Sequence, residues 1–229
     1  MGTLLAKGIA VFFAGLLGGQ VLYGFAKAPS FLLRPPGAQG EEDFLARCIG
    51  CGKCIEACPY VAVRSAPFAV GPAAGTPVID AREQACRLCE GFPCVGACPT
   101  GALRDVGVRT DVRMGTAVID EELCIAIDGG IRCEVCYRSC PLINRAIDIE
   151  LRPRAGDSTH VLFAPVIDEE QCVGCGLCVE RCVVGDPAPA IRIGPPQNAP
   201  PPAPQSAPES APQSVPEGAP QHASEKKGT

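Results

Sequence analysis

The chain has 229 residues and a mass of 23.7 kDa, and its 16 Cys, 24 Pro and 26 Gly leave little sequence for a large apolar core. Only 5% of the residues are aromatic and Trp is absent, which disfavours an enzyme built on long helices or a wide sheet. The net charge is −5, with Lys and Arg scattered along the chain, so we expect no binding of nucleic acid. Something other than apolar burial must therefore hold the chain together.

Residues 1–7 precede an uncharged apolar stretch, residues 8–26. As a helix it reaches roughly 28 Å, close to the ~30 Å apolar thickness of a bilayer. We expect a membrane anchor or an export-signal helix here. The positive charges that follow the stretch favour a cytoplasmic domain. Residues 2–8 also suit the segment after a twin-arginine motif, which would place the domain outside the cytoplasm, although no twin arginine is present.

Residues 27–40 contain Pro29, Pro35 and Pro36 and are predicted to be a linker. A short helix is predicted from Glu41, because acidic residues in a first turn complement the partial positive charge of a helix N-terminus. We expect the folded domain to span residues 41–193. Residues 194–229 are rich in Pro, Ala, Gln and Ser, which predicts a disordered tail.

All sixteen cysteines fall into four groups of four. The groups are Cys48, Cys51, Cys54, Cys58; Cys86, Cys89, Cys94, Cys98; Cys124, Cys133, Cys136, Cys140; and Cys172, Cys175, Cys178, Cys182. The first and fourth have the spacing of bacterial [4Fe-4S] ligation. A loop with a thiolate at every third residue can bind three corners of a cubane. The fourth cysteine, followed by proline in three of the groups, is directed toward a second cluster.

The groups also share a local context, which indicates an internal repeat. Segments typical of short strands precede the last three groups, and shorter apolar segments follow the last three groups as returning strands. The first kind comprises residues 76–80, 116–120 and 164–168, and the second 102–103, 146–147 and 190–191. The repeat predicts an α+β fold of tandem or nested two-cluster ferredoxin-like units, with little regular secondary structure. Four groups imply four [4Fe-4S] clusters.

Two other uses of cysteine are weighed against this interpretation. Structural zinc sites pair CxxC motifs at longer separations or mix Cys with His, whereas the chain has only His160 and His222. Disulfides would suit an exported, Cys-rich chain, but cysteines at three-residue steps are not a typical disulfide framework. Both alternatives therefore explain the repeated spacing less well than iron–sulfur ligation does.

Six segments resemble the NapG/MauM group of ferredoxin-type proteins, and the match extends from about Leu33 to Ile193. The long gap between Cys124 and Cys133 is its most distinguishing feature. The segments are residues 32–38, 41–48, 93–103, 111–120, 130–147 and 172–183. The chain departs from the family in lacking a twin arginine and in having Val183 where a proline would close the fourth group.

The resemblance implies that all sixteen cysteines bind four [4Fe-4S] clusters. It also implies electron flow from a quinol-oxidising membrane partner to a redox-enzyme acceptor, at the periplasmic face of the inner membrane. A further resemblance, to the four-cluster subunits of molybdenum oxidoreductases, favours nested pairing of the groups, first with fourth and second with third. The implied ligand sets are Cys48, Cys51, Cys54 with Cys182; Cys172, Cys175, Cys178 with Cys58; Cys86, Cys89, Cys94 with Cys140; and Cys124, Cys133, Cys136 with Cys98.

No catalytic constellation accompanies the cysteines: Ser-His-Asp sets, a GxGxxG motif and a P-loop are all missing. We therefore expect an electron carrier without a substrate site of its own. The alternatives are a cluster subunit of a molybdenum oxidoreductase and a maturation or scaffold factor for a partner enzyme. Five further residues are candidates for tuning a cluster or bordering an electron path, and surface or packing roles are the plainer alternatives for them, namely His160, Tyr60, Tyr137, Arg132 and Arg138.

Overall fold

The computed structural model describes residues 31–154 and 156–196. The predicted anchor at 8–26 and the tail from residue 197 onward lie outside the described residues. Among the helices of the described ranges, none has the length and apolarity that a membrane crossing requires. All described residues belong to one unit of the chain.

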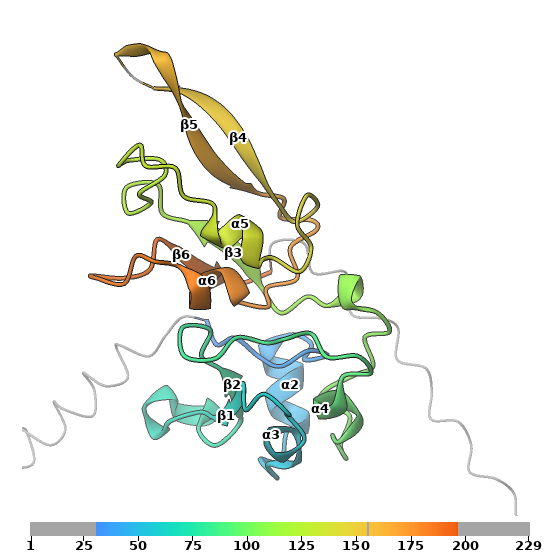
Figure 1. Cartoon of the computed structure of the whole chain (residues 1–229). Coiled ribbons are helices and arrows are strands. Elements are labelled where there is room, and N and C mark those ends of the chain that lie inside the picture. The colour runs from blue at the N-terminus through green and yellow to red at the C-terminus, as the bar shows by residue number, and fades with distance from the viewer. Residues whose placement is uncertain (1–30, 155, 197–229) are drawn as a thin grey trace, which may run out of the picture. The chain divides into compact units, whose positions relative to one another are not determined.

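One arrangement occurs twice along the chain (Figure 1). We call residues 31–106 the first half and residues 116–196 the second half. Between them, residues 107–115 form a connecting segment with one 3-10 turn, η2 (Arg109–Asp111). Each half contains two short helices that contact each other and two antiparallel pairings, an inner one between the strands that separate its cysteine groups and an outer one between the segments that flank them. The first half also contains one further helix and a 3-10 helix.

The predicted helix after residue 40 is confirmed as α2. Helices α3 and α4 contact each other, and β1 pairs antiparallel with β2 as the inner pairing. The outer pairing is a single bridge between Ala38 and Leu103. The elements of the first half are α2 (Glu41–Arg47), α3 (Lys53–Glu56), β1 (Val63–Ser65), η1 (Phe68–Ala73), β2 (Pro77–Ile79) and α4 (Pro93–Gly96).

The second half repeats this plan with longer strands. Helices α5 and α6 contact each other, β4 pairs with β5 as the inner pairing, and β3 pairs with β6 as the outer one. The β4–β5 pair is a long two-stranded hairpin, drawn in yellow and brown in Figure 1. The elements are β3 (Thr116–Ile119), α5 (Val135–Ser139), β4 (Ile147–Arg154), β5 (Asp157–Ile167), α6 (Leu177–Arg181) and β6 (Ile191–Gly194).

The strand pairings join consecutive cysteine groups. Strand β1 follows the first group and pairs with β2, which precedes the second; β4 follows the third group and pairs with β5, which precedes the fourth. The nested pairing, first group with fourth and second with third, is therefore wrong, and the two ferredoxin-like units are in tandem. Pairing consecutive segments closes a shorter loop, which costs less chain entropy.

The predicted strand segments are confirmed. Residues 76–80 contain β2, residues 116–120 contain β3, and residues 164–168 overlap the end of a longer β5. Of the predicted returning strands, Ile147 begins β4 and Ile191 begins β6, whereas Leu103 forms only the isolated bridge.

The last part of the predicted linker, residues 27–40, is packed into the first half. Residues 33–37 are buried. The Arg34 guanidinium donates hydrogen bonds to Thr76 Oγ1 and to the Pro77 carbonyl, 2.8 Å each, and lies 4.7 Å from the centre of the Phe44 ring. The folded unit in the structure thus begins before Glu41, because a buried arginine ties this segment to β2.

The apolar cores are small. The larger core is built around Phe44 and Leu88 of the first half and Val112 of the connecting segment, which are fully buried. The core of the second half contains mainly small side chains, Ala117 and Ala146 among them, together with Val179 and Ile191. Cysteines belong to both cores, so much of the interior surrounds thiols rather than large hydrocarbon side chains.

Candidate iron–sulfur sites

Four hollows in the structure are each lined by four cysteines. In every hollow, three cysteines come from one group and the remaining one is the last cysteine of the neighbouring group in the same half. Site I contains Cys48, Cys51, Cys54 and Cys98; site II Cys86, Cys89, Cys94 and Cys58; site III Cys124, Cys133, Cys136 and Cys182; and site IV Cys172, Cys175, Cys178 and Cys140.

The hollows fit a multi-iron group. The empty space at them, open solvent included, is similar: about 330 Å³ at site I, 340 Å³ at site II, 390 Å³ at site III and 370 Å³ at site IV. All sixteen cysteines are free thiols. Within residues 31–154 and 156–196, no three Cys, His, Asp or Glu side chains converge closely enough to share one metal ion. Zinc needs such convergence, at ~2.3 Å per sulfur, whereas a cubane takes one thiolate on each of its irons.

Short helices position one cysteine of each group. Cys54, Cys94, Cys136 and Cys178 lie on α3, α4, α5 and α6. The loops that lead into α3 and α6 pass through glycines with positive φ. Gly174 shows why: a Cβ at this position would lie 2.4 Å from the backbone N and O of Gly115. The ligand loop therefore packs directly on backbone.

Backbone N–H groups donate to the sulfur atoms at three of the sites. Ala62 N lies 3.3 Å from Cys58 Sγ and Leu88 N 3.5 Å from Cys86 Sγ at site II, Ala117 N lies 3.4 Å from Cys172 Sγ at site IV, and Leu103 N lies 3.5 Å from Cys98 Sγ at site I. Such donors stabilise thiolate charge and raise the potential of a bound cluster. Sequence analysis did not identify them, since a backbone donor has no residue-type signature.

Burial dominates the ionisation of the thiols. Burial, with a smaller contribution from neighbouring thiolates, raises the pKa of Cys54 to about 11 and that of Cys136 to about 12. At Cys98, burial also raises the pKa, but hydrogen bonds from Leu103 and Thr100 outweigh it, so the pKa is lowered overall. A thiol whose pKa burial raises in this way is neutral at pH 7 without iron, and metal binding must release its proton.

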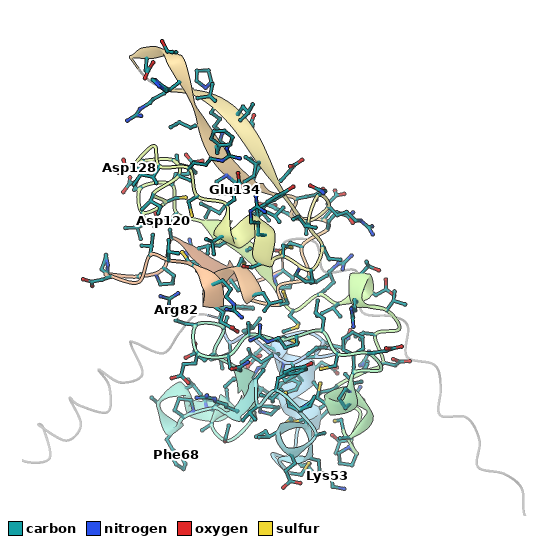
Figure 2. All side chains as sticks on the ribbon, in the orientation of Figure 1. Lys53, Phe68, Arg82, Asp120, Asp128 and Glu134 are labelled. Atoms are coloured by element: carbon teal, nitrogen blue, oxygen red, sulfur yellow. The ribbon has the colours of Figure 1, made fainter. Side chains whose placement is uncertain are left out.

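The long gap in the third group forms a closed turn. Ile127 N and Asp128 N each donate to the Cys124 carbonyl at 2.9 Å, and Ile131 N donates to the Ile125 carbonyl at 3.0 Å. The chain reverses, so Cys133 lines the same hollow as Cys124. Figure 2 shows Asp128 on this turn. An eight-residue insertion thus preserves the ligand arrangement.

The hairpin braces this turn. The Arg132 guanidinium lies 4.6 Å from the centre of the Phe163 ring on β5, and Arg152 on β4 pairs with Glu121 at 2.8 Å. Pro165 of β5 also lines site III. The second half therefore uses its long hairpin to hold one of its two sites.

The five residues predicted to tune a cluster or border an electron path lie in different surroundings. Tyr60 lines site II. His160 is exposed and pairs with Asp157, Nδ1 to Oδ2 at 2.7 Å. The remaining three make contacts outside the hollows: the Tyr137 hydroxyl donates to Asn144 Oδ1, Arg132 stacks on Phe163, and Arg138 pairs with Glu134.

Comparisons with known proteins agree with the two halves. A family model described as a 4Fe-4S dicluster domain matches residues 47–102 and 131–185, each of which contains consecutive groups, with Cys124 just outside the second match. The ferredoxin-type protein NapG of Escherichia coli K12 is 44% identical over 165 residues, 71% of each chain. The methylamine utilization ferredoxin-type protein MauM of Methylobacillus flagellatus is 39% identical over 196 residues, 83% of this chain and 80% of its own. Two dicluster domains and sixteen cysteines are consistent with four [4Fe-4S] clusters.

Proposed function

Because the chain belongs to the NapG/MauM family of ferredoxin-type proteins, we propose that it carries single electrons through four [4Fe-4S] clusters bound at sites I to IV. The observation that carries this proposal is the gathering of sixteen cysteines into four hollows of four. In each site the four thiolates would bind the four irons, one each.

The protein's own residues supply binding and environment, and each bound cluster supplies a one-electron couple. The thiolates hold the irons, backbone N–H groups such as that of Ala62 offset their negative charge, and apolar walls limit the access of water. Electron transfer of this kind needs no substrate site. We therefore propose a carrier rather than an enzyme with its own substrate.

We further propose that the protein works at the inner membrane, on the periplasmic face, between a quinol-oxidising membrane protein and a redox-enzyme acceptor. Membership of the family supports this placement. The uncharged residues 8–26 support attachment to the membrane, because their length suits a spanning helix.

A reductive titration tests the proposal. The anaerobically purified protein should accept about four electrons per chain, one for each cluster. Membranes that contain quinol should deliver the same electrons, and reoxidation should leave the iron and sulfide content unchanged. Transfer of whole clusters to a cluster-free protein, with loss of iron from the chain, would instead support a role in maturation.

A further inference from the structure

The two halves meet at sites II and IV. The backbone N–H of Cys86, which lines site II, donates to the carbonyl of Cys175, which lines site IV, at 3.0 Å. Both cysteines are buried in the same apolar core. One ligand of each half therefore lies beside one of the other.

Similar contacts connect the sites inside each half. In the first half, helix α3, which carries Cys54 of site I, contacts helix α4, which carries Cys94 of site II. In the second half, helix α5, which carries Cys136 of site III, contacts helix α6, which carries Cys178 of site IV. These proximities order the sites as I, II, IV, III, which is not their order along the sequence.

A partly buried ion pair holds the junction. Glu180 lies on α6, and its carboxylate accepts from the Ala85 N–H and from Arg87 Nη2, at 2.7 Å each. The Glu180 side chain is 13% exposed and the Arg87 side chain 23%, so solvent screens this ion pair less than it screens a pair at the surface. Arg87 directly follows Cys86. The contact therefore ties the site II loop to the helix that carries Cys178.

Two further contacts bring the halves together. Arg82 Nη1 donates to the carbonyls of Val179 and Cys182, at 3.0 and 2.8 Å, near the C-terminal end of α6. Figure 2 shows Arg82 between the end of β2 and α6. At Gly176, a Cβ would lie 2.5 Å from the Cβ of Ala81, so glycine permits the close approach.

We propose that electrons cross between the halves at sites II and IV, beside Cys86 and Cys175, and that Glu180 with Arg87 positions this crossing. The proposal rests on the proposed function. In the crossing, the cluster held at one of these sites would lose one electron and the cluster held at the other would gain it, and no bond or proton would change. Sites I and III are then the two ends of the route, where donor and acceptor dock.

The test isolates the two central sites in the full chain. Replacing two ligands at each end site should leave about eight irons per chain. The replacements are Cys48→Ala, Cys51→Ala, Cys124→Ala and Cys133→Ala. After reduction with dithionite, the electron paramagnetic resonance spectrum should show spin–spin splitting between sites II and IV. In the same background, Glu180→Ala should abolish the splitting with the iron content unchanged.

Three further variants separate positioning from folding. Glu180→Gln should retain the splitting, since its amide oxygen can still accept from the Ala85 N–H. Arg87→Ala should weaken the splitting. This variant tests the positioning role if the Glu180→Ala protein does not bind its clusters. Glu83→Gln is the matched control, because Glu83 lies on the same loop but pairs with Arg64 of its own half.

The converse background lacks the central sites and retains the end sites. Its replacements are Cys89→Ala, Cys94→Ala, Cys172→Ala and Cys178→Ala, and it should show no splitting. Splitting there, or none in the first background, overturns the crossing, and unchanged splitting in Glu180→Ala overturns the positioning role. A parent chain without iron and sulfide would contradict the proposed function instead, so the two failures are distinguishable.

Discussion

The exchange of one cysteine between neighbouring groups is the residue-scale feature on which the sites depend. Cys98 ends the second group but lines site I, and Cys58 ends the first group but lines site II. Leu103 N donates to Cys98 Sγ at 3.5 Å, and this hydrogen bond orients the thiol toward site I. Each half therefore closes only when both of its groups are folded.

The exchange predicts which replacements share a cluster. Cys98→Ala and Cys51→Ala should each remove about four of sixteen irons, and the double variant should lose no more, because both thiols bind one cluster. Cys98→Ala with Cys133→Ala should lose about eight. Iron and sulfide analysis measures this. Non-additive loss for Cys98 with Cys133 would revive the nested arrangement.

At the scale of elements, the segment before α2 acts as a clamp on the first half. Arg34 is 5% exposed and spans from Glu41 to the carbonyl of Pro77. Leu33 O accepts from Ile79 N at 2.8 Å, so the segment also covers the free side of β2. Composition alone suggested a linker, because prolines such as Pro35 and Pro36 are typical of loops and do not show whether the segment is buried.

Removing this clamp should destabilise the protein. Arg34→Ala leaves the Pro77 carbonyl without its side-chain donor and should lower the free energy of unfolding by about 1–3 kcal/mol. Arg47→Ala removes an exposed pair with Asp43 and should cost at most ~0.5 kcal/mol. Anaerobic denaturant unfolding compares them. Equal midpoints for the two variants would contradict the role of the buried segment.

The hairpin has a corresponding role in the second half. Phe163→Ala removes the stacking partner of Arg132, an interaction worth roughly 0.5–2 kcal/mol, and should make site III the first to lose iron. Val161→Ala, on an exposed position of the same strand, serves as the control. Iron release to a chelator can be followed by absorbance. The same release rate in both variants would show that the hairpin does not support the site.

At the scale of the whole molecule, the sequence indicated four clusters but not which cysteine groups share them. The regular spacing of Cys48, Cys51 and Cys54 indicates a ligand loop, because thiolates at every third residue can bind three irons of one cubane. Which groups share clusters depends on contacts between distant segments, and the ligand spacing within a group does not show these contacts. The available signal was local: the turn around Gly156 joins two strand-like segments, which favours pairing of the third group with the fourth.

The sequence contains no comparable signal for the contacts between the two halves. Arg87 and Glu180 are 93 residues apart, and each resembles an ordinary surface charge in the sequence. Only the folded chain brings them together beside Cys86. Residues of this kind can be identified only from the folded structure, which shows that they lie beside the ligand loops.

The small cores imply that folding depends on the clusters. With alanines forming much of the second core, apolar burial is too limited to stabilise the half without its metal groups. Chelation of iron under reducing anaerobic conditions should therefore give a largely unfolded chain. Circular dichroism during heating reports this. A cooperative transition of the iron-free chain at the temperature of the loaded protein would contradict it.

The most direct measurement is the metal and sulfide content of anaerobically purified protein, together with its absorption spectrum before and after dithionite. About sixteen irons and sixteen sulfides per chain, with a brown colour that bleaches on reduction, are expected from four cubanes. Zinc without sulfide, or colourless protein with oxidised thiols, would contradict the electron-carrier role and return the cysteines to a structural one.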